Sequence, residues 1–245
     1  MLARSGELKH SICITTLNDA RTLEASLTSL FSQIDADDTE VVVVDSESTD
    51  GSTEILRRYE ARGNLRLIVR RCSVGMGRQL AFLNSKGDYI LAYFDTDDVF
   101  RQNLREILRR YHAEMEGMTV KGRDFLVIPR EAVSKAGGWP DTHTAEDLRF
   151  LWQLRSAGIR VVETDWSVRA KSRSKSFRGP FRVLESSRRI WDMTAIGMRP
   201  WKMNRKWRMV WLFILAVRRV TPRTGLPGSG MVNGVLSLEA ARETP

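Results

Sequence analysis

The chain of 245 residues is 42% hydrophobic, which is enough for the core of one α/β domain and argues against global disorder. Its two cysteines are too few for a disulfide framework or a zinc site, so we expect small buried side chains in a reducing cytoplasm. The formal net charge is +9, and the excess lies after residue 150, where 19 Lys and Arg stand against 6 Asp and Glu. Such a basic segment is attracted to phosphates of nucleic acid, anionic lipid or a phosphorylated substrate, although it is often only a solvated face.

Strands and helices are predicted to alternate through the first hundred residues. Residues 40–44 contain four successive β-branched valines, which is typical of a strand buried on both faces, whereas Leu23, Leu27 and Leu30 repeat at helical spacing. In chain order we expect a strand over 11–16, a helix over 20–34, a strand over 40–44, a helix over 52–60, a strand over 65–69, a helix over 75–84 and a strand over 89–94. This alternation favours an α/β fold with an open, mostly parallel sheet flanked by helices.

Beyond Asp98 the alternation loosens. The expected elements are a charged helix over 102–116, a strand over 125–128, a turn over 137–140, a helix over 146–157 and a strand over 159–162. Residues 169–220 are predicted to form a basic, Trp-rich loop and helical extension, followed by a flexible tail over 221–245. We expect no signal peptide and no transmembrane helix, because residues 1–10 are polar and the longest apolar run, 209–217, is shorter than the roughly 20 residues that span a bilayer.

The acidic sequence Asp95-Thr96-Asp97-Asp98 directly follows the apolar run 89–94. Three carboxylates this close repel one another, so they are expected at the end of a buried strand only where a cation or ligand offsets the repulsion. Alternate residues of an extended segment point the same way, and Asp95 and Asp97 can therefore offer oxygens to one hard divalent cation, Mg²⁺ or Mn²⁺. The alternative is a solvated acidic turn that caps the following helix.

Polar clusters follow three of the predicted strands. They are Thr15–Asn18, Asp45–Glu47 and Asp95–Asp97. In open α/β sheets, ligands bind beyond the carboxyl ends of the strands. Because these ends fall on one edge of one sheet, the three clusters together predict a binding site.

The order of these motifs resembles that of glycosyltransferase family 2, whose members have the Rossmann-like GT-A fold. Thr15–Asp19 resembles the family's Pro-Thr-Tyr-Asn segment, and residues 40–52 resemble its strand ending in Asp-Asp-Gly-Ser-Thr-Asp-Gly. Gly75–Ala81 resembles the stretch Gly-x-x-x-Ala-Arg-Asn-x-Gly, and Phe94–Asp98 resembles the metal-binding motif. Gly137–Trp139 and Glu146–Leu148 resemble the acceptor-side motifs. Ser46 and Glu47 replace the second Asp and the Gly of the second motif. The resemblance implies a GT-A domain over 1–168, with a donor half over about 9–100 and an acceptor half over about 101–168.

The resemblance implies roles for four donor-side residues. Asp45 would accept a hydrogen bond from the nucleobase, while Thr16 and Asn18 would line the nucleotide pocket. The alternative for Asp45 is a turn residue. Arg78 would add positive charge at the donor, and an ordinary surface arginine is the alternative at that position.

The metal and the general base follow from the same resemblance. Asp95 would lie near the ribose or a metal-bound water, and Asp97 would bind Mn²⁺ or Mg²⁺ directly. That cation would neutralise the diphosphate of a UDP- or GDP-sugar as it leaves. Asp147 would take the proton of an acceptor hydroxyl, and direct attack opposite the leaving group would invert the anomeric centre. The alternative for Asp147 is a helix-capping acid.

Five residues are expected on the acceptor or phosphate side. Trp139 belongs to the Gly-Gly-aromatic motif, and Glu146 precedes the predicted base. His143 is placed to contact the acceptor or phosphate, although a loop histidine is more often solvated. Arg169 and Lys171 are interpreted as a mobile basic loop that closes over the diphosphate, with a solvated linker as the alternative.

The C-terminal segment combines tryptophan with basic residues. Trp191, Trp201, Trp207 and Trp211 are interleaved with Lys and Arg. This pattern favours an interfacial helix on an anionic membrane surface. A helix packed on the domain is the main alternative, and binding to single-stranded nucleic acid is not expected. We therefore expect a cytoplasmic protein with peripheral contact at the inner face of the cell membrane, and a saccharide or polyprenyl-phosphate-linked acceptor.

The sequence as a whole predicts an inverting, metal-dependent glycosyltransferase that moves a sugar from a nucleotide-diphosphate donor to a saccharide or lipid-linked acceptor. Two alternatives stay open. A nucleotidyltransferase also uses paired aspartates on a parallel sheet, but it would more usually carry a Gly-rich basic loop, and Thr15–Asn18 contains none. A non-catalytic GT-A-like protein would use the same fold to bind membrane or anionic polymer.

Overall fold

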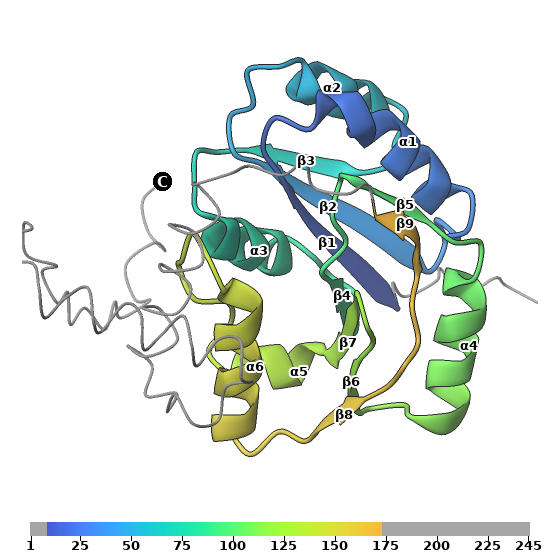
Figure 1. Cartoon of the computed structure of the whole chain (residues 1–245), viewed down its shortest axis with the longest axis vertical. Coiled ribbons are helices and arrows are strands. Elements are labelled where there is room, and N and C mark those ends of the chain that lie inside the picture. Colours follow the sequence, from blue (N-terminus) through green and yellow to red (C-terminus); the bar gives the residue numbers. More distant parts are fainter. Residues whose placement is uncertain (1–8, 173–245) are drawn as a thin grey trace, which may run out of the picture.

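Residues 9–172 are described by the computed structural model, and they form a twisted central sheet covered by helices on both faces (Figure 1). The sheet contains β1 (His10–Thr16), β2 (Thr39–Asp45), β3 (Arg66–Val69), β4 (Tyr89–Ala92), β6 (Thr119–Lys121), β7 (Leu126–Pro129) and β8 (Val161–Glu163), in the order β3-β2-β1-β4-β7-β6-β8. Only β7 runs against its neighbours in this sheet; every other neighbouring pair is parallel. The prediction of a mostly parallel α/β sheet is confirmed.

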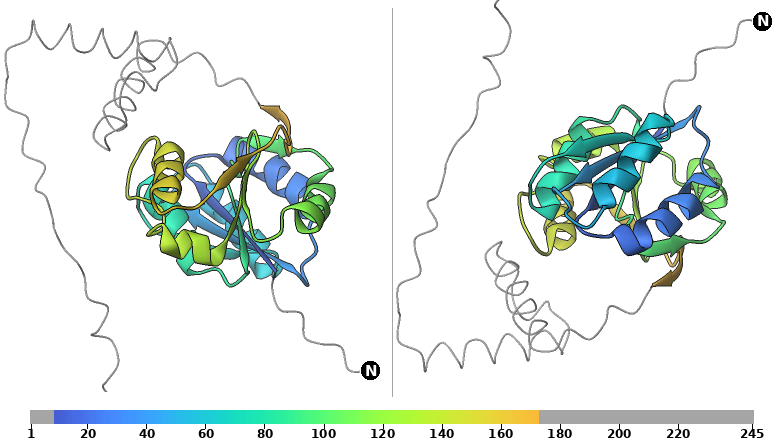
Figure 2. Two further views of the ribbon diagram at one scale, coloured as in Figure 1. Left: turned by 90° about the horizontal axis from the view of Figure 1, so that it is seen from below. Right: turned by 90° about the horizontal axis from the view of Figure 1, so that it is seen from above.

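Helices cover the two faces of the sheet in groups of three. One face carries α1 (Ala20–Phe31), α2 (Ser52–Ala61) and α4 (Leu104–Glu114), and the other carries α3 (Val74–Leu83), α5 (Arg130–Lys135) and α6 (Glu146–Ser156) (Figure 2). Successive strand residues point to opposite faces, so Ile12 and Ile14 enter the first core while Cys13 enters the second. Each fully buried aliphatic side chain contributes about 1.5–3 kcal/mol, which makes these two cores the main source of stability.

The described structure differs from the predicted elements mainly after β4. The strand expected over 89–94 ends at Ala92, because Tyr93 has a φ of +71° and turns the chain. Three short elements were not predicted: β5 (Asp98–Phe100), β6 and α5. Arg169–Ser172, predicted as the start of a mobile loop or linker, instead forms β9 and pairs with β5.

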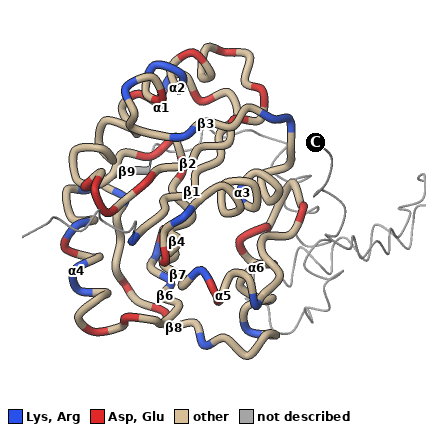
Figure 3. The backbone as a smooth tube through the Cα atoms, turned by 180° about the vertical axis from the view of Figure 1, so that it is seen from behind, with Lys and Arg blue, Asp and Glu red and all other residues tan. Residues whose placement is uncertain are grey.

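Acidic and basic residues are both distributed along the described chain (Figure 3). In α4 they form an i,i+3 pair and an i,i+4 pair. Cys13 is buried and Cys72 half-buried, and both are free thiols. None of the helices in the described part of the chain has the length and apolar character needed to cross a bilayer. The predicted Trp-rich helix and the tail over 221–245 lie outside the described residues.

Candidate functional site

A cavity of about 530 Å³ opens at the carboxyl ends of the parallel strands, where the sequence predicted a site. Thr15 at the end of β1 and Asp95–Asp97 after β4 line it from the donor half. Glu146 and Asp147 at the start of α6 line it from the acceptor half. The cavity therefore joins the motifs that the sequence places more than a hundred residues apart.

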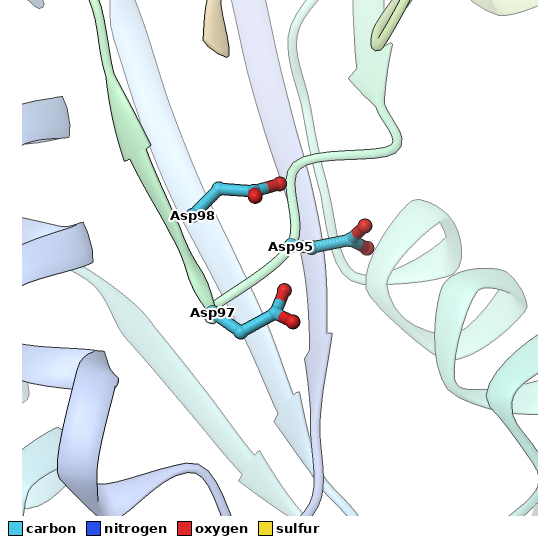
Figure 4. Close-up of side chains that lie close together, drawn as sticks. All are labelled: Asp95, Asp97 and Asp98. Atoms are coloured by element: carbon cyan, nitrogen blue, oxygen red, sulfur yellow. The ribbon is translucent and has the colours of Figure 1, made fainter. Parts of the chain in front are cut away.

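Asp95, Asp97 and Asp98 form an acidic cluster beside this cavity. Each offers one carboxylate oxygen, and these oxygens lie within 4.8 Å of one another (Figure 4). The grouping arises because a turn closed by the Asp98 N–H and the Asp95 carbonyl, 3.2 Å apart, folds Asp98 back toward Asp95. Three carboxylate oxygens are a donor set suited to Mg²⁺ or Mn²⁺, so the residues fit the cation that the resemblance implies.

Asp98 was not predicted as a site residue, although it adjoins the predicted metal ligand Asp97. It is the first residue of β5 and is only 2% exposed. Burial raises the pKa of Asp98 to about 7; Arg169 opposes the rise, while Asp95 and Asp97 add to it. The structure thus enlarges the predicted pair of aspartates to a cluster of three.

Two arginines balance the charge of the acidic cluster. The Arg169 Nη2 atom lies 3.2 Å from Asp95 Oδ2 and also contacts Asp98 Oδ2. On the other side, Arg78 Nη2 lies 3.6 Å from Asp95 Oδ1. The cluster is therefore held by cationic side chains from α3 and from β9.

Arg78 also links the donor half to the acceptor half. Its Nη2 atom lies 3.5 Å from Glu146 Oε1, and its guanidinium stacks 5.1 Å from the centre of the Tyr93 ring. The side chain is only 6% exposed, so the alternative of an ordinary surface arginine is wrong. Burial raises the pKa of Glu146, and the charge of Arg78 opposes that rise.

Asp147 is exposed and faces the cavity from the first turn of α6. Ala145, directly before the helix, has a φ of +56°, and the Tyr93 hydroxyl donates a 3.4 Å hydrogen bond to the Asp147 carbonyl. The helix start is therefore fixed against the turn that carries the acidic cluster. The general-base role of Asp147 stays a prediction.

The loops after β1 and β2 are joined by hydrogen bonds. The Asn18 N–H donates to Ser48 Oγ at 2.9 Å, and the Asn18 side-chain carbonyl accepts from the Thr49 N–H at 2.8 Å. Asn18 and Glu47 both have left-handed backbones, with φ of +58° and +59°. A second cavity of about 220 Å³ lies against these loops, lined by Thr16 among others.

Asp45 is fully buried beneath this pair of loops. One carboxylate oxygen accepts from the N–H and hydroxyl of Ser48, at 3.1 and 2.5 Å, and the other accepts from the Thr53 hydroxyl. In the described structure Asp45 therefore shapes the loop, as the turn-residue alternative states. Its expected contact with a nucleobase stays a prediction.

A hydroxyl–carboxylate link that was not predicted joins the β1 loop to the acidic turn. The Asp19 carboxylate accepts hydrogen bonds from the hydroxyls of Thr16 and Thr96. Thr96 is only 2% exposed. The position of the acidic turn is thus set by the first loop, and only the placement of Thr96 between two acids hints at this in the sequence.

The acceptor-side predictions have different outcomes. Trp139 is a core residue that is 4% exposed and stacks on Phe150 with ring centres 4.1 Å apart, so it has a packing role in the described structure. Its expected acceptor contact stays a prediction. His143 is exposed and lines both cavities, as Glu146 and Arg169 line the larger one. The side chain of Lys171 lies outside the described residues.

The end of β6 and the turn that follows it supply further lining residues that the sequence did not reveal. They are Lys121, Arg123 and Asp124. Asp124 accepts hydrogen bonds from the backbone N–H groups of Val168 and Arg169, at 3.0 and 3.2 Å. No motif marks these residues, because they reach the site only through the pairing of short strands.

Comparison with protein families decides the classification. The model described as "Glycosyl transferase family 2" matches residues 11–135, which is about half of the chain. The chain belongs to glycosyltransferase family 2. Its order of strands and helices is that of the GT-A fold, as the sequence predicted.

Curated relatives of this family 2 chain are similar over only part of their length. The chain is 35% identical over 106 residues to abequosyltransferase RfbV of Salmonella typhimurium, covering 41% of this chain and 32% of that protein. It is 27% identical over 131 residues to the poly(ribitol-phosphate) β-N-acetylglucosaminyltransferase TarS of Staphylococcus aureus, covering 50% of this chain and 23% of that protein. The chain therefore matches at most about a third of the length of either relative.

A solved structure supports the fold over more of the chain. The mannosyltransferase PcManGT from Pyrobaculum calidifontis, in complex with GDP-Man and Mn²⁺, aligns with a TM-score of 0.66 at 17% identity. The alignment covers 88% of this chain and 76% of that one. At this identity the likeness concerns the fold alone.

Proposed function

We propose that this family 2 glycosyltransferase is an inverting, metal-dependent enzyme that transfers a sugar from a UDP- or GDP-sugar to an acceptor hydroxyl. The observation that carries the proposal is one cavity lined both by Asp95 and Asp97 of the acidic cluster and by Asp147. The donor class is supported by solved relatives: TarS structures contain UDP or UDP-GlcNAc, and PcManGT contains GDP-Man.

The acidic cluster of Asp95, Asp97 and Asp98 would hold the divalent cation, Mn²⁺ or Mg²⁺. When bound, the cation supplies positive charge that neutralises the departing nucleoside diphosphate. Structures of PcManGT and of the glucosyl-3-phosphoglycerate synthase of Mycobacterium tuberculosis contain Mn²⁺, which supports the choice of ion.

The chain's own residues then orient the reactants and move the proton. Asp147 takes the proton of the acceptor hydroxyl as that oxygen attacks, and its exposure leaves room for the acceptor. Arg78 keeps the carboxylates of Asp95 and Glu146 in place, so that neither moves into the path of the acceptor. Attack from the Asp147 side, opposite the leaving diphosphate, inverts the anomeric carbon.

The test is release of nucleoside diphosphate from a panel of UDP- and GDP-sugars with Mn²⁺, Mg²⁺ or chelator, with and without candidate acceptors. We expect turnover of one donor that chelator and Asp97→Ala abolish. Asp147→Asn should lower kcat by about 10²- to 10⁴-fold with little change in donor KM. The exposed Asp37→Asn in a distant loop is the matched control for loss of one carboxylate.

Two results would overturn the proposal. Turnover that survives chelator and Asp97→Ala would remove the metal from the mechanism. Metal-dependent binding of a donor without turnover with any acceptor would instead favour the non-catalytic GT-A-like protein.

We further propose a saccharide or polyprenyl-phosphate-linked acceptor, with peripheral contact at the inner face of the cell membrane. The support is the Trp-rich basic sequence after residue 190, which lies outside the described residues. Co-sedimentation with anionic liposomes should be lost in a chain that ends at Met198. Equal sedimentation of both chains would refute the assignment to this segment.

A further inference from the structure

Arg169 places a positive charge inside the acidic cluster. A single nitrogen, Nη2, contacts Asp98 Oδ2 and lies 3.2 Å from Asp95 Oδ2. Two of the three carboxylates that would hold a divalent cation are thus bridged by one guanidinium. A cation entering the cluster would meet the like charge of Arg169 within a few ångströms, and the two charges repel.

The backbone of Arg169 is fixed independently of its side chain. Arg169 pairs with Phe100 across β5 and β9, and its N–H donates to Asp124 Oδ2 at 3.2 Å. Its carbonyl accepts a 2.8 Å hydrogen bond from Arg101 Nε. The guanidinium can therefore leave the carboxylates by side-chain rotation while the strand stays in place.

Arg78, the other arginine of the cluster, is less able to move. Its side chain is 6% exposed, against 27% for Arg169. It is also held by Glu146 and by the ring of Tyr93. Arg169 is thus the exchangeable cation, and it lines the same cavity that would receive the donor.

We infer that Arg169 is a built-in counter-ion that competes with the divalent cation for Asp95 and Asp98 and transfers to the donor diphosphate when that cation binds. The inference rests on the proposed function. Without nucleotide, the displaced guanidinium loses its contacts with the carboxylates of Asp95 and Asp98, so the cation binds weakly. With nucleotide, the diphosphate takes up Arg169, and each ligand strengthens the binding of the other by the same factor.

The experiment measures Mn²⁺ binding without nucleotide, and binding of UDP or GDP at saturating Mn²⁺, by calorimetry and by the electron-spin signal of free Mn²⁺. For Arg169→Met we expect Mn²⁺ affinity without nucleotide to rise about tenfold, as expected for the loss of one charge-assisted pair. Nucleotide affinity with Mn²⁺ should fall about tenfold. Arg169→Lys should retain much of both wild-type values, and the distant, exposed Arg160→Met should retain them fully.

The opposite directions of the two changes exclude a merely structural role, since a disrupted site would bind both ligands less well. The inference is overturned if Arg169→Met leaves Mn²⁺ affinity unchanged or lowers it. In that case the proposed function stands as long as the wild type binds Mn²⁺ and nucleotide together and Asp97→Ala does not. If no form of the protein binds nucleotide with Mn²⁺, both the inference and the proposed function fail.

Discussion

Gly75 in the first turn of α3 packs directly against the loop that follows Trp139. A Cβ atom at this position would lie 1.9 Å from the Pro140 carbonyl oxygen, whereas ordinary contact begins at 3.4 Å. The loop would have to retreat by about 1.5 Å, the difference between these distances. That movement would break the 3.0 Å hydrogen bond from the Gly75 N–H to the Thr142 carbonyl.

The expected cost of Gly75→Ala follows from three terms. Overpacking against a backbone atom costs about 1–3 kcal/mol, and the lost hydrogen bond costs about 1 kcal/mol. The higher helix propensity of alanine returns about 1 kcal/mol. We expect the free energy of unfolding to fall by about 2 kcal/mol, which at an m-value of about 2 kcal/mol/M lowers the urea midpoint by about 1 M.

Gly77→Ala is the matched control two residues along the same helix. Its Cβ would lie 2.7 Å from the Thr15 methyl group, a side-chain atom that can move, so we expect a change within about 1 kcal/mol. Urea unfolding followed by circular dichroism measures both variants. The reasoning is refuted if Gly75→Ala is as stable as the wild type, or if Gly77→Ala is the more damaging change.

Two further predictions concern pH. Burial lowers the pKa of His10 to about 4, and the nearby charge of His112 lowers it further. Below about pH 6.5 the His10 side chain is therefore protonated in the unfolded chain but stays neutral in the folded chain until about pH 4. The free energy of unfolding should therefore fall by up to about 3 kcal/mol between pH 6.5 and 4. His10→Gln should flatten this decline when it is measured by urea titrations. If the free energy of unfolding of the variant fell as steeply with pH as that of the wild type, the assignment to His10 would be contradicted. Burial raises the pKa of Glu146, so its ionisation above the ordinary glutamate pKa costs stability in the folded state. Glu146→Gln should raise the urea midpoint at pH 7 and lose this advantage toward pH 4, and a midpoint below wild type at pH 7 would show that the pair with Arg78 outweighs burial.

The sheet was predictable because its central strands carry strong local patterns. Residues 41–44 are four successive valines, and the Leu23, Leu27 and Leu30 spacing fits a helix. The strands that were missed, β5, β6 and β9, have three or four residues each. Such short strands bury too few side chains to produce a recognisable alternation of apolar and polar residues in the sequence. Their pairing partners are determined by the tertiary fold.

The candidate site was predictable where it depends on strand ends and not where it depends on turns. Sequence motifs contain Asp95, Asp97 and Asp147, and all three residues line one cavity. Arg169 was expected near the diphosphate, but its pairing with Asp98 follows from the β5–β9 ladder. Trp139 was assigned to the acceptor because of its motif, whereas its large apolar ring is used to pack α6 on the sheet.

Glu47 stands where the resembled family motif has a glycine, and its φ of +59° explains why glycine suits the position. A left-handed conformation costs an L-residue about 1–2 kcal/mol, so the backbone of the loop after β2 is strained where it passes the smaller cavity. The hydrogen bonds from Ser48 to Asp45 hold the loop in this strained conformation. A glycine at position 47 would remove this strain and allow the loop more backbone conformations. The glutamate restricts the loop to fewer conformations than a glycine would.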